Sequence, residues 1–457
     1  MDDYLRLADR VAADIASGRL RPGQRLLPQR TFARRCGVAA STAGRVYGEL
    51  VRRGLVVGEV GRGTFVRATP PETADARALT EPTATAPPGR EPAGHPPVTP
   101  VNLELNYPSA PGQSELLAPA LAALLDPASL TDALRPAPAT GTSGARTAVA
   151  ELLGVPGHRP APGQVLFTGN GRQAIAAALA SLVRPGGRVG VETLTYPLVK
   201  EIAGRLGITL VPLDTDAEGP LPRSVAAAHR SAPLSALYLQ PALHNPTSRT
   251  MPEPRRRAVA RVVTDLGIPV VEDRVWSFLR PETPLAALAP ALTHVVDGLS
   301  KRVAPGLTAG FLVVPPERVP AVAAAIRSGG WSAGRFALDA AVRWIEDGTV
   351  ARLVAAKRAD AARRQRLLAA CLPGFAVRSD PHAYYAWWEL PAPWRADTFT
   401  AAAAAHGIAV TPGRAFAVDP AHTPDAVRLG LASAPPADLE RALRTLADVA
   451  RRGRTGR

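Results

Sequence analysis

Cysteine is nearly absent from this chain of 457 residues, which contains only Cys36 and Cys371. Two cysteines exclude a disulfide framework and argue against a cysteine-based zinc site, and they fit a reducing compartment. No apolar run approaches the roughly 18 residues that a membrane span needs. The acidic start MDDYLRLADR also lacks the basic segment and apolar core of a secretory signal. We therefore expect a cytoplasmic protein with no membrane partner and no metal.

Lysine is almost as scarce, because the 54 basic residues include only Lys200, Lys301 and Lys357. The guanidinium group of arginine stays protonated, so arginine cannot replace an amine that forms a Schiff base. A retained lysine is therefore a candidate for that chemistry, although we expect at least two of the three to be ordinary surface lysines. The net charge of +15 suggests a polyanionic partner.

The length and the composition predict more than one folded unit. A chain of this length usually forms two or three domains, and 46% hydrophobic residues can build sizeable cores. We expect a compact unit over residues 1–67 and a linker rich in Pro, Ala and Thr over 68–100. A large α/β body follows over residues 101–450.

The first unit has the pattern of a winged helix-turn-helix. Apolar residues at helical spacing predict a helix over 4–17, and a second short helix follows near 30–36. Ser41 or Thr42 is expected to cap a third helix that ends near residue 53, and LVVGEVGRGTFV predicts a hairpin. The third helix of this fold enters the major groove and the wing approaches the DNA backbone. Each candidate arginine could instead be a solvated surface residue; the DNA-contact candidates are Arg30, Ser41, Thr42, Arg45, Arg62 and Gly63.

This unit resembles the GntR family of bacterial regulators. The resemblance lies in SGRLRPGQRL, in the turn over 33–38, in V-Y-x-E-L over 46–50, and in GLV…GRGTFV over 54–66. Two departures stand out. Leu26, Leu27 and Pro28 replace the usual Leu-Pro-Ser, and Gly44 stands where a second arginine often precedes Arg45. These departures are expected to alter DNA affinity or sequence preference.

The large body alternates apolar runs of strand length with helical segments. This alternation predicts a mainly parallel sheet with helices on both faces, followed by a smaller α+β part over about 318–450. The expected strands are VLFTG (165–169), RVGVE (188–192), TLVPL (209–213), ALYLQ (236–240), PVVED (269–273), HVVDG (294–298) and GFLVV (310–314).

Candidate ligand-binding groups fall at the carboxyl ends of these strands, where ligands bind in such sheets. The Gly-rich turn over 168–173 could hold a phosphate at a helix N-terminus, or it could be a plain connection. Tyr196 could stack on a planar ring or belong to the core, and Asn245 could simply start an Asn-Pro turn. Asp273 could keep a pyridinium nitrogen protonated or cap a helix. Lys301 follows a strand end and is the Schiff-base candidate.

Together and in this order, these motifs resemble the fold type I pyridoxal-phosphate aminotransferases over residues 101–450. With the winged helix attached, the chain resembles the MocR-type, pyridoxine-regulator-like subfamily of GntR regulators. The resemblance implies pyridoxal 5′-phosphate as cofactor, Lys301 as its Schiff-base lysine, Asp273 at the pyridinium, Asn245 at the phenolic oxygen, and Arg428 at an effector carboxylate. The cofactor-binding residues implied are Gly169, Asn170, Gly171, Arg172, Gln173, Tyr196, Asn245, Asp273, Ser300 and Lys301.

The chain departs from the aminotransferase pattern at several of these positions. Thr308 stands where the family places an arginine on the cofactor phosphate, so phosphate binding should weaken unless Arg302 or Arg172 substitutes. Val275 and Trp276 stand where a tyrosine is common, and Arg172 replaces a second glutamine. These changes favour a pocket that senses a ligand over one that turns over a substrate.

Three functions are compatible with these motifs. The first is a transcriptional regulator that binds double-stranded operator DNA and uses pyridoxal phosphate to sense an amine or amino acid. The resemblance implies a homodimer for it, with each winged helix reaching over the partner subunit. The second is a working aminotransferase with a vestigial DNA-binding domain. The third is a regulator that has lost the cofactor and keeps the fold as a scaffold.

Overall fold

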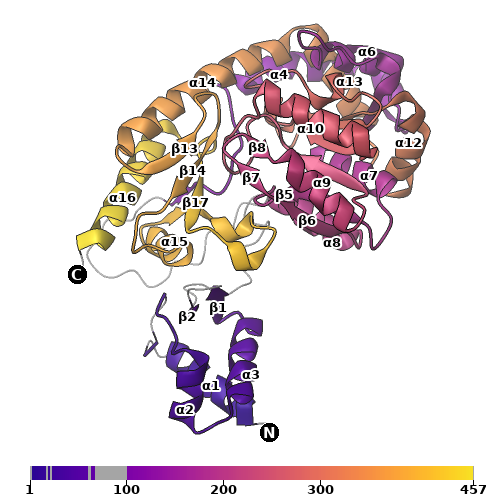
Figure 1. Cartoon of the computed structure of the whole chain (residues 1–457). Helices are drawn as coiled ribbons and strands as arrows, with labels where there is room; N and C mark the ends of the chain where they lie inside the picture. Colours follow the sequence, from indigo (N-terminus) through magenta and orange to yellow (C-terminus); the bar gives the residue numbers. More distant parts are fainter. Residues whose placement is uncertain (1–2, 17–18, 21–22, 60–62, 67–99, 456–457) are drawn as a thin grey trace.

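The computed structural model describes residues 3–16, 19–20, 23–59, 63–66 and 100–455 (Figure 1). Apart from residue 100, the expected linker lies outside these residues, as does Arg62. The N-terminal unit contains α1 (Asp3–Ala16), α2 (Gln29–Cys36), α3 (Ala40–Arg52) and the antiparallel strands β1 (Val56–Glu59) and β2 (Gly63–Val66). Its apolar core joins all three helices to the hairpin and includes Leu7, Val11, Val46, Leu50, Val56 and Val66.

Helix α3 starts earlier than expected, and this changes the role of two residues. Its N-cap is Ala39, in an extended conformation, so Ser41 and Thr42 lie inside the first turn and do not cap the helix. The helix therefore begins without a side-chain cap.

At the hairpin, Gly63 has a φ of +121°, and an added Cβ would lie 2.5 Å from Nε of Arg25. The positive φ favours glycine at this position, whereas the exposed Arg25 side chain could move to admit a Cβ.

A seven-stranded sheet forms the centre of the large body. Its strand order is β4-β12-β11-β10-β9-β5-β6, and β12 runs in the direction opposite to the other six strands. The expected fold class is therefore confirmed. The strands are β4 (Val165–Thr168), β5 (Arg188–Glu192), β6 (Thr209–Leu213), β9 (Ala236–Leu239), β10 (Val270–Asp273), β11 (Thr293–Gly298) and β12 (Gly310–Val313).

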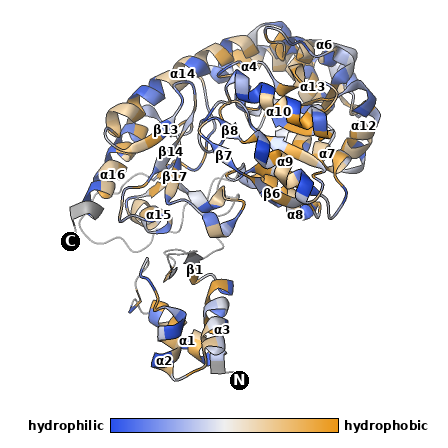
Figure 2. Ribbon diagram, viewed as in Figure 1, coloured by the Kyte–Doolittle hydropathy of each residue, from blue (hydrophilic) through white to orange (hydrophobic). Residues whose placement is uncertain are grey.

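Helices cover both faces of this sheet because successive side chains of its strands point to opposite sides. In β12, for example, Leu312 packs toward one helical layer, whereas Phe311 and Val313 pack toward the other. Figure 2 shows apolar strands between helices whose outer surfaces are polar. On the Leu312 side lie α7 (Gly171–Leu182), α8 (Pro197–Arg205) and α12 (Val319–Ser328). On the other side lie α4 (Gln113–Ala122), α6 (Ser143–Leu152), α9 (Pro222–Ser231), α10 (Glu253–Leu266), α13 (Arg335–Glu346) and α14 (Thr349–Cys371).

The C-terminal part is a four-stranded antiparallel sheet with helices packed against it. Its strand order is β13 (Ala376–Ser379), β14 (Tyr385–Glu389), β17 (Ala426–Gly430) and β16 (Thr411–Pro412). Helix α14 reaches this sheet from the large body. It packs against the sheet together with α15 (Ala396–Ala405) and α16 (Pro436–Thr455). Among the other elements are α5 (Pro127–Ala133), α11 (Leu299–Arg302), and the short strands β7 (Thr215–Asp216) and β8 (Gly219–Pro220).

The start of the large body belongs to the C-terminal part, which the sequence did not predict. Strand β3 (Val101–Asn102) pairs with β15 (Ile408–Ala409), and the Gly430 amide donates to the Leu103 carbonyl at 2.7 Å. The segment that follows β3, residues 104–107, is thereby held close to the end of β17.

No single helix in the described ranges is long and apolar enough to cross a membrane. One sharply bent pair, over 113–125 and 127–133, meets that test by length and composition alone.

Candidate functional site

One pocket collects most of the residues predicted to bind a cofactor. Eight of the ten line it, and Arg428 lines it as well. Gly169 and Gln173 do not, although they belong to the same turn. Sequence reasoning missed Glu104, Asn106, Tyr107, Gln240 and Tyr385, which also line the pocket. The eight predicted residues are Asn170, Gly171, Arg172, Tyr196, Asn245, Asp273, Ser300 and Lys301.

The turn between β4 and α7 forms one part of the pocket wall. Asn170 is the N-cap of α7, and its side chain accepts a hydrogen bond from the Gln173 amide at 3.1 Å. Helix geometry leaves the amides of Gly171 and Arg172 without intrahelical acceptors, and such amides favour an anion. Gly310 of β12 permits this packing, because an added Cβ would lie 2.4 Å from the Asn170 carbonyl.

Of the two arginines considered as replacements at the phosphate, only one reaches the pocket. Arg302 is buried and forms an ion pair with Asp297 at 2.5 Å, so it does not line the pocket. Arg172 does line it and is an exposed residue at the pocket rim. Thr308 also lines the pocket and contributes a hydroxyl group there, but no charge. Arg172 is therefore the better placed of the two to replace the missing phosphate-binding arginine.

Asp273 lies at the end of β10, with 5% of its surface exposed. Its carboxylate accepts hydrogen bonds from the Tyr238 hydroxyl at 2.6 Å, from Nε2 of Gln240 at 3.0 Å and from the Val275 amide at 3.0 Å. Burial raises the pKa of this carboxyl group, and the three hydrogen bonds oppose that rise. Within the described ranges no cation forms an ion pair with Asp273. A protonated ring nitrogen would supply the missing charge.

Lys301 lies in the four-residue helix α11, and it lines the pocket. Nζ donates to the Asn106 carbonyl at 2.8 Å and lies 4.2 Å from the centre of the Tyr107 ring. Burial, together with the positive charges of Arg428, Lys357 and Arg172, lowers the pKa of Lys301 to about 7. Much of the group is therefore the neutral, nucleophilic amine at neutral pH.

The expectation that two of the three lysines lie on the surface is wrong. Lys357 has no exposed surface, and Lys200 is half-buried and donates to the Ala417 carbonyl at 3.2 Å.

Arg428 lies in β17 and brings a cation into the pocket from the C-terminal part. Its guanidinium donates to the Glu104 carbonyl, to Oγ1 of Thr411 at 3.2 Å and to Oδ1 of Asn245 at 3.5 Å. Burial lowers the pKa of Arg428 to about 10, so the group remains a cation at neutral pH. Burial raises the pKa of the Glu104 carboxyl group to about 7, against the influence of Arg428.

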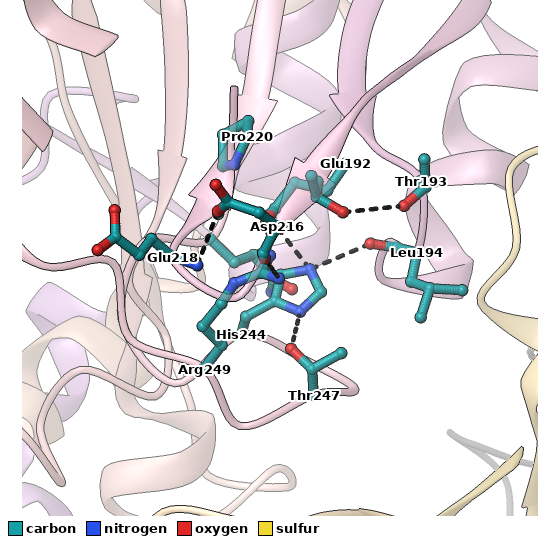
Figure 3. A network of polar contacts seen from close by, with 12 residues as sticks. Glu192, Thr193, Leu194, Asp216, Glu218, Pro220, His244, Thr247 and Arg249 are labelled. Carbon is teal, nitrogen blue, oxygen red and sulfur yellow. Dashed lines mark hydrogen bonds and ion pairs between the residues drawn. The ribbon is translucent and has the colours of Figure 1, made fainter. Parts of the chain in front are cut away.

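A buried polar network fixes the turn that carries Asn245 (Figure 3). His244 contacts Oγ1 of Thr247 at 2.8 Å, the Leu194 carbonyl at 3.0 Å and Oε2 of Glu192 at 3.2 Å. Glu192 also forms an ion pair with Arg249. Burial lowers the pKa of His244 to about 4, so this histidine is neutral at physiological pH. The network ties the turn to the end of β5.

Aromatic side chains form much of the remaining wall. Trp276 is 8% exposed and packs against Tyr385, with ring centres 5.5 Å apart. Tyr196, the residue predicted to stack on a ring, lines the same pocket, and burial raises the pKa of its hydroxyl group. Trp276 also lies 5.1 Å from Nζ of Lys301, measured from the ring centre.

The predicted DNA-contact residues that the structure describes lie on α2, α3 and the hairpin. Arg30 and Ser41 are exposed, and Thr42 and Arg45 belong to α3. The guanidinium of Arg45 lies 3.9 Å from the centre of the Tyr4 ring, which orients it against α1. These positions are consistent with a contact surface, and their roles stay predictions.

Comparison with known proteins supports both halves of the chain. Residues 99–446 match the model of aminotransferase class I and II, and residues 3–66 match that of the bacterial regulatory proteins of the gntR family. An uncharacterized HTH-type transcriptional regulator of Bacillus subtilis, YdeF, is 27% identical over 94% of this chain and 90% of its own length. The HTH-type transcriptional regulator TauR of Rhodobacter capsulatus is 28% identical over 70% of this chain and 69% of its own.

Solved structures support the fold of the body. LysN, an α-aminoadipate aminotransferase of Thermus thermophilus crystallised with N-(5′-phosphopyridoxyl)-L-leucine, has a TM-score of 0.70 at 22% identity, covering 78% of this chain and 93% of its own. An aspartate aminotransferase of Thermus thermophilus gives 0.68 at 25% identity, over 77% and 92%. The chain therefore belongs to the aminotransferase class I and II family and joins that fold to an N-terminal domain of the GntR family of bacterial regulators.

Proposed function

We propose that this chain is a MocR-type transcriptional regulator whose aminotransferase-like body binds pyridoxal phosphate and senses an amine or amino acid. One observation carries the proposal: a single pocket holds the Lys301 amine, the buried Asp273 carboxyl group and the Arg428 guanidinium. The same chain begins with a winged helix-turn-helix. The two relatives named above are both HTH-type transcriptional regulators, which supports a regulatory role for this combination.

The residues of the pocket fit the cofactor. When bound, pyridoxal phosphate supplies an aldehyde that reacts with primary amines and a pyridine ring that withdraws electrons. Asp273 would hold the protonated ring nitrogen, Asn245 the phenolic oxygen, and Tyr196 a face of the ring. Arg172, with the amides at the start of α7, would hold the phosphate. Because the pKa of Lys301 is about 7, much of its amine would be in the neutral form that reacts with the aldehyde.

Arg428 and Lys301 define the two ends of the effector. The planar guanidinium of Arg428 suits a bidentate contact with a carboxylate. An effector amine would lie near Lys301, because both amines compete for the same aldehyde. A small amino acid therefore fits the pocket better than a simple amine does. Such a ligand regulates only if it binds one arrangement of the DNA-binding domains more tightly than the other.

The N-terminal unit would bind double-stranded operator DNA in the cytoplasm. Helix α3 would enter the major groove, with Arg45, Ser41 and Thr42 near the bases and Arg30 near the backbone. Arg62 and Gly63 would form the wing. A homodimer would present two such units, which matches the two half-sites that dimeric regulators bind.

Visible absorption spectra test the cofactor claim. Wild type and Lys301→Ala are mixed with pyridoxal phosphate, recorded before and after borohydride reduction, and analysed by mass spectrometry. We expect a band and a covalent adduct in wild type only. Binding of the intact protein to DNA from around its own gene at moderate salt tests the regulator claim. The absence of a band in both proteins would contradict the first claim, and the absence of DNA binding would contradict the second.

A working aminotransferase is the second candidate, because Asp273, Lys301 and Arg428 all line the pocket. Thr308 and Trp276 count against it. Steady turnover of an amino donor and a keto acid by the full chain would favour this function. A protein that stays colourless with excess pyridoxal phosphate, yet binds DNA, would instead indicate a regulator that uses the fold as a scaffold.

A further inference from the structure

Lys357 of α14 is completely buried and contacts the backbone of the lysine proposed to react. Its Nζ donates to the backbone carbonyl of Lys301 at 3.1 Å and to that of Val303 at 2.6 Å. No carboxylate among the described residues forms an ion pair with it. The next acidic group along its own helix, Asp360, is engaged by Arg363 and Arg364. Lys357 is therefore a buried amine whose partners are backbone carbonyls.

Such an arrangement needs a physical reason, because burying an ammonium group without a counter-ion is costly. Burial lowers the pKa of Lys357 to about 8, which leaves most of the group charged at neutral pH. An apolar side chain of similar length would fill the same space without that cost. Hydrogen bonds to the two carbonyl oxygens are what a lysine provides here and a methionine or leucine does not.

Helix α11 requires help from outside to hold its shape. It has four residues, which is a single turn, and one turn is not stable by itself. Val303, which follows it, has φ −109° and ψ −93°, so the chain leaves the helix abruptly. The carbonyls at a helix end have no intrahelical donors. Lys357 supplies donors to two of them, and Nε2 of Gln113 donates to the Val303 carbonyl as well, at 3.2 Å.

We propose that Lys357 is a positioning residue for Lys301: its buried amine clamps the backbone of α11 and so fixes where the Lys301 amine enters the pocket. The proposal rests on the function proposed above, because a lysine needs a fixed position only if it reacts. It also gives the second of the three lysines a role that arginine, with its larger planar head, would fill less well.

The same helix connects Lys301 to the strand that carries Arg428. Nη1 of Arg364 donates to the carbonyls of Leu431 at 2.5 Å and Ala434 at 2.6 Å, immediately after β17. Helix α14 thus holds the backbone beside both the amine end and the carboxylate end of the effector. Helix α14 therefore contacts the backbone of α11 and the segment that follows β17.

Two variants and one control separate position from charge. Lys357→Met removes the amine, Lys357→Arg keeps a charged donor, and Lys200→Met removes a lysine that also donates to a backbone carbonyl but lies elsewhere. In the full-length apo protein, ¹³C labelling of lysine gives three signals, and the titration of Lys301 is followed directly. The charged groups that face Lys301 are Arg428 from β17, Arg172 from α7 and Lys357 from α14. Lys357→Met should raise the pKa of Lys301, and the other two variants should leave it near the wild-type value.

Covalent capture of pyridoxal phosphate then tests position. The rate is measured at pH 9, above the wild-type Lys301 pKa of about 7, and is divided by the neutral fraction that the titration gives for each variant; borohydride trapping identifies the adduct. We expect Lys357→Met to react about tenfold more slowly than wild type or more, because a small displacement of a reacting group is costly. Lys357→Arg should recover much of the rate, and Lys200→Met should match wild type.

Each outcome decides the proposal. An unchanged capture rate in Lys357→Met would overturn it, whatever the Lys301 titration shows, because the titration reports the charge of Lys357 and the capture rate reports the position of Lys301. If that variant does not fold, the wild-type spectrum decides: the Lys357 signal must move when Lys301 is modified, while the Lys200 signal stays, and a Lys357 signal that does not move overturns the proposal. If wild type captures no pyridoxal phosphate, the proposed function fails, whereas the response of the Lys357 signal to modification of Lys301 still tests the contact between the two lysines.

Discussion

Replacing Asp273 by asparagine should weaken cofactor binding without weakening the fold. In the structure this carboxyl group has three hydrogen-bond donors and no ion-pair partner among the described residues. Burying this carboxyl group therefore lowers the free energy of unfolding of the apo protein. The carboxyl group gains a favourable ionic contact only when a protonated ring nitrogen binds beside it. Residues that serve ligand binding at the expense of stability have this signature.

The magnitude follows from the contacts. A hydrogen bond between a protonated ring nitrogen and a buried carboxylate contributes about 1.5–3 kcal/mol, so its loss weakens pyridoxal phosphate binding about 10- to 100-fold. In the apo protein, the asparagine oxygen still accepts from Tyr238 and Gln240, and its amide opposes the Val275 amide. That loses one hydrogen bond, about 1 kcal/mol. Relief of the carboxyl desolvation offsets this loss, so the apo melting temperature should change by no more than about 3 °C.

Asp297 provides the matched control. It also lies near the carboxyl end of a central strand, but it forms a buried ion pair with Arg302. Asp297→Asn leaves that guanidinium buried without its counter-ion and should destabilise the apo protein by about 3 kcal/mol or more. Thermal melts of the apo proteins and absorbance titrations with pyridoxal phosphate distinguish the two. A large loss of apo stability in Asp273→Asn, with unchanged cofactor affinity, would refute the reasoning.

Four further predictions concern the rest of the chain. Arg428→Gln should lower the affinity for amino acids about 30-fold and leave the affinity for amines without a carboxylate unchanged, as measured by spectral titration. Thr308→Arg should tighten pyridoxal phosphate binding about tenfold, and the gain should shrink with added salt. Arg30→Ala should lower operator affinity and reduce the salt slope by about one, as measured by fluorescence anisotropy. His244 is held neutral, so its contribution to stability is complete above pH 6.5 and falls by about 1.4 kcal/mol per unit toward pH 4; urea unfolding of His244→Asn should show a shallower acid loss.

The large sheet could be predicted because its strands, apart from the edge strand β6, are buried on both faces and occur as short apolar runs between polar segments. The positions of the turn residues at the strand ends followed from those runs. For this reason the amino-acid sequence alone could place Asp273 and Lys301 at one ligand site, and both line the pocket. The antiparallel direction of β12 could not be inferred from GFLVV, since strand direction leaves no mark on an isolated apolar run.

The missed residues depend on contacts between distant parts of the chain. Glu104 and Tyr107 enter the pocket because β3 pairs with β15, far away in sequence, and a two-residue strand has no recognisable pattern. The burial of Lys357 could not be predicted, because a lysine in a long, arginine-rich helix has the pattern of a solvated face. The expected caps at Ser41 and Thr42 were wrong for a local reason: the extended residue that precedes α3 is Ala39, which has no capping side chain.

The pocket keeps the three groups on which the proposed function rests and lacks one charge that the family places at the cofactor phosphate. Asp273, Lys301 and Arg428 line it together, whereas Thr308 lacks the charge that the family places at the phosphate. A regulator tolerates that loss, because it needs only a difference in ligand affinity between two arrangements, and tenfold corresponds to about 1.4 kcal/mol. An enzyme would need every later step to remain fast as well. The hydrogen bonds of Lys357 to the carbonyls of Lys301 and Val303 join α11 to a helix that also reaches the C-terminal sheet, which is a contact that a regulator could use.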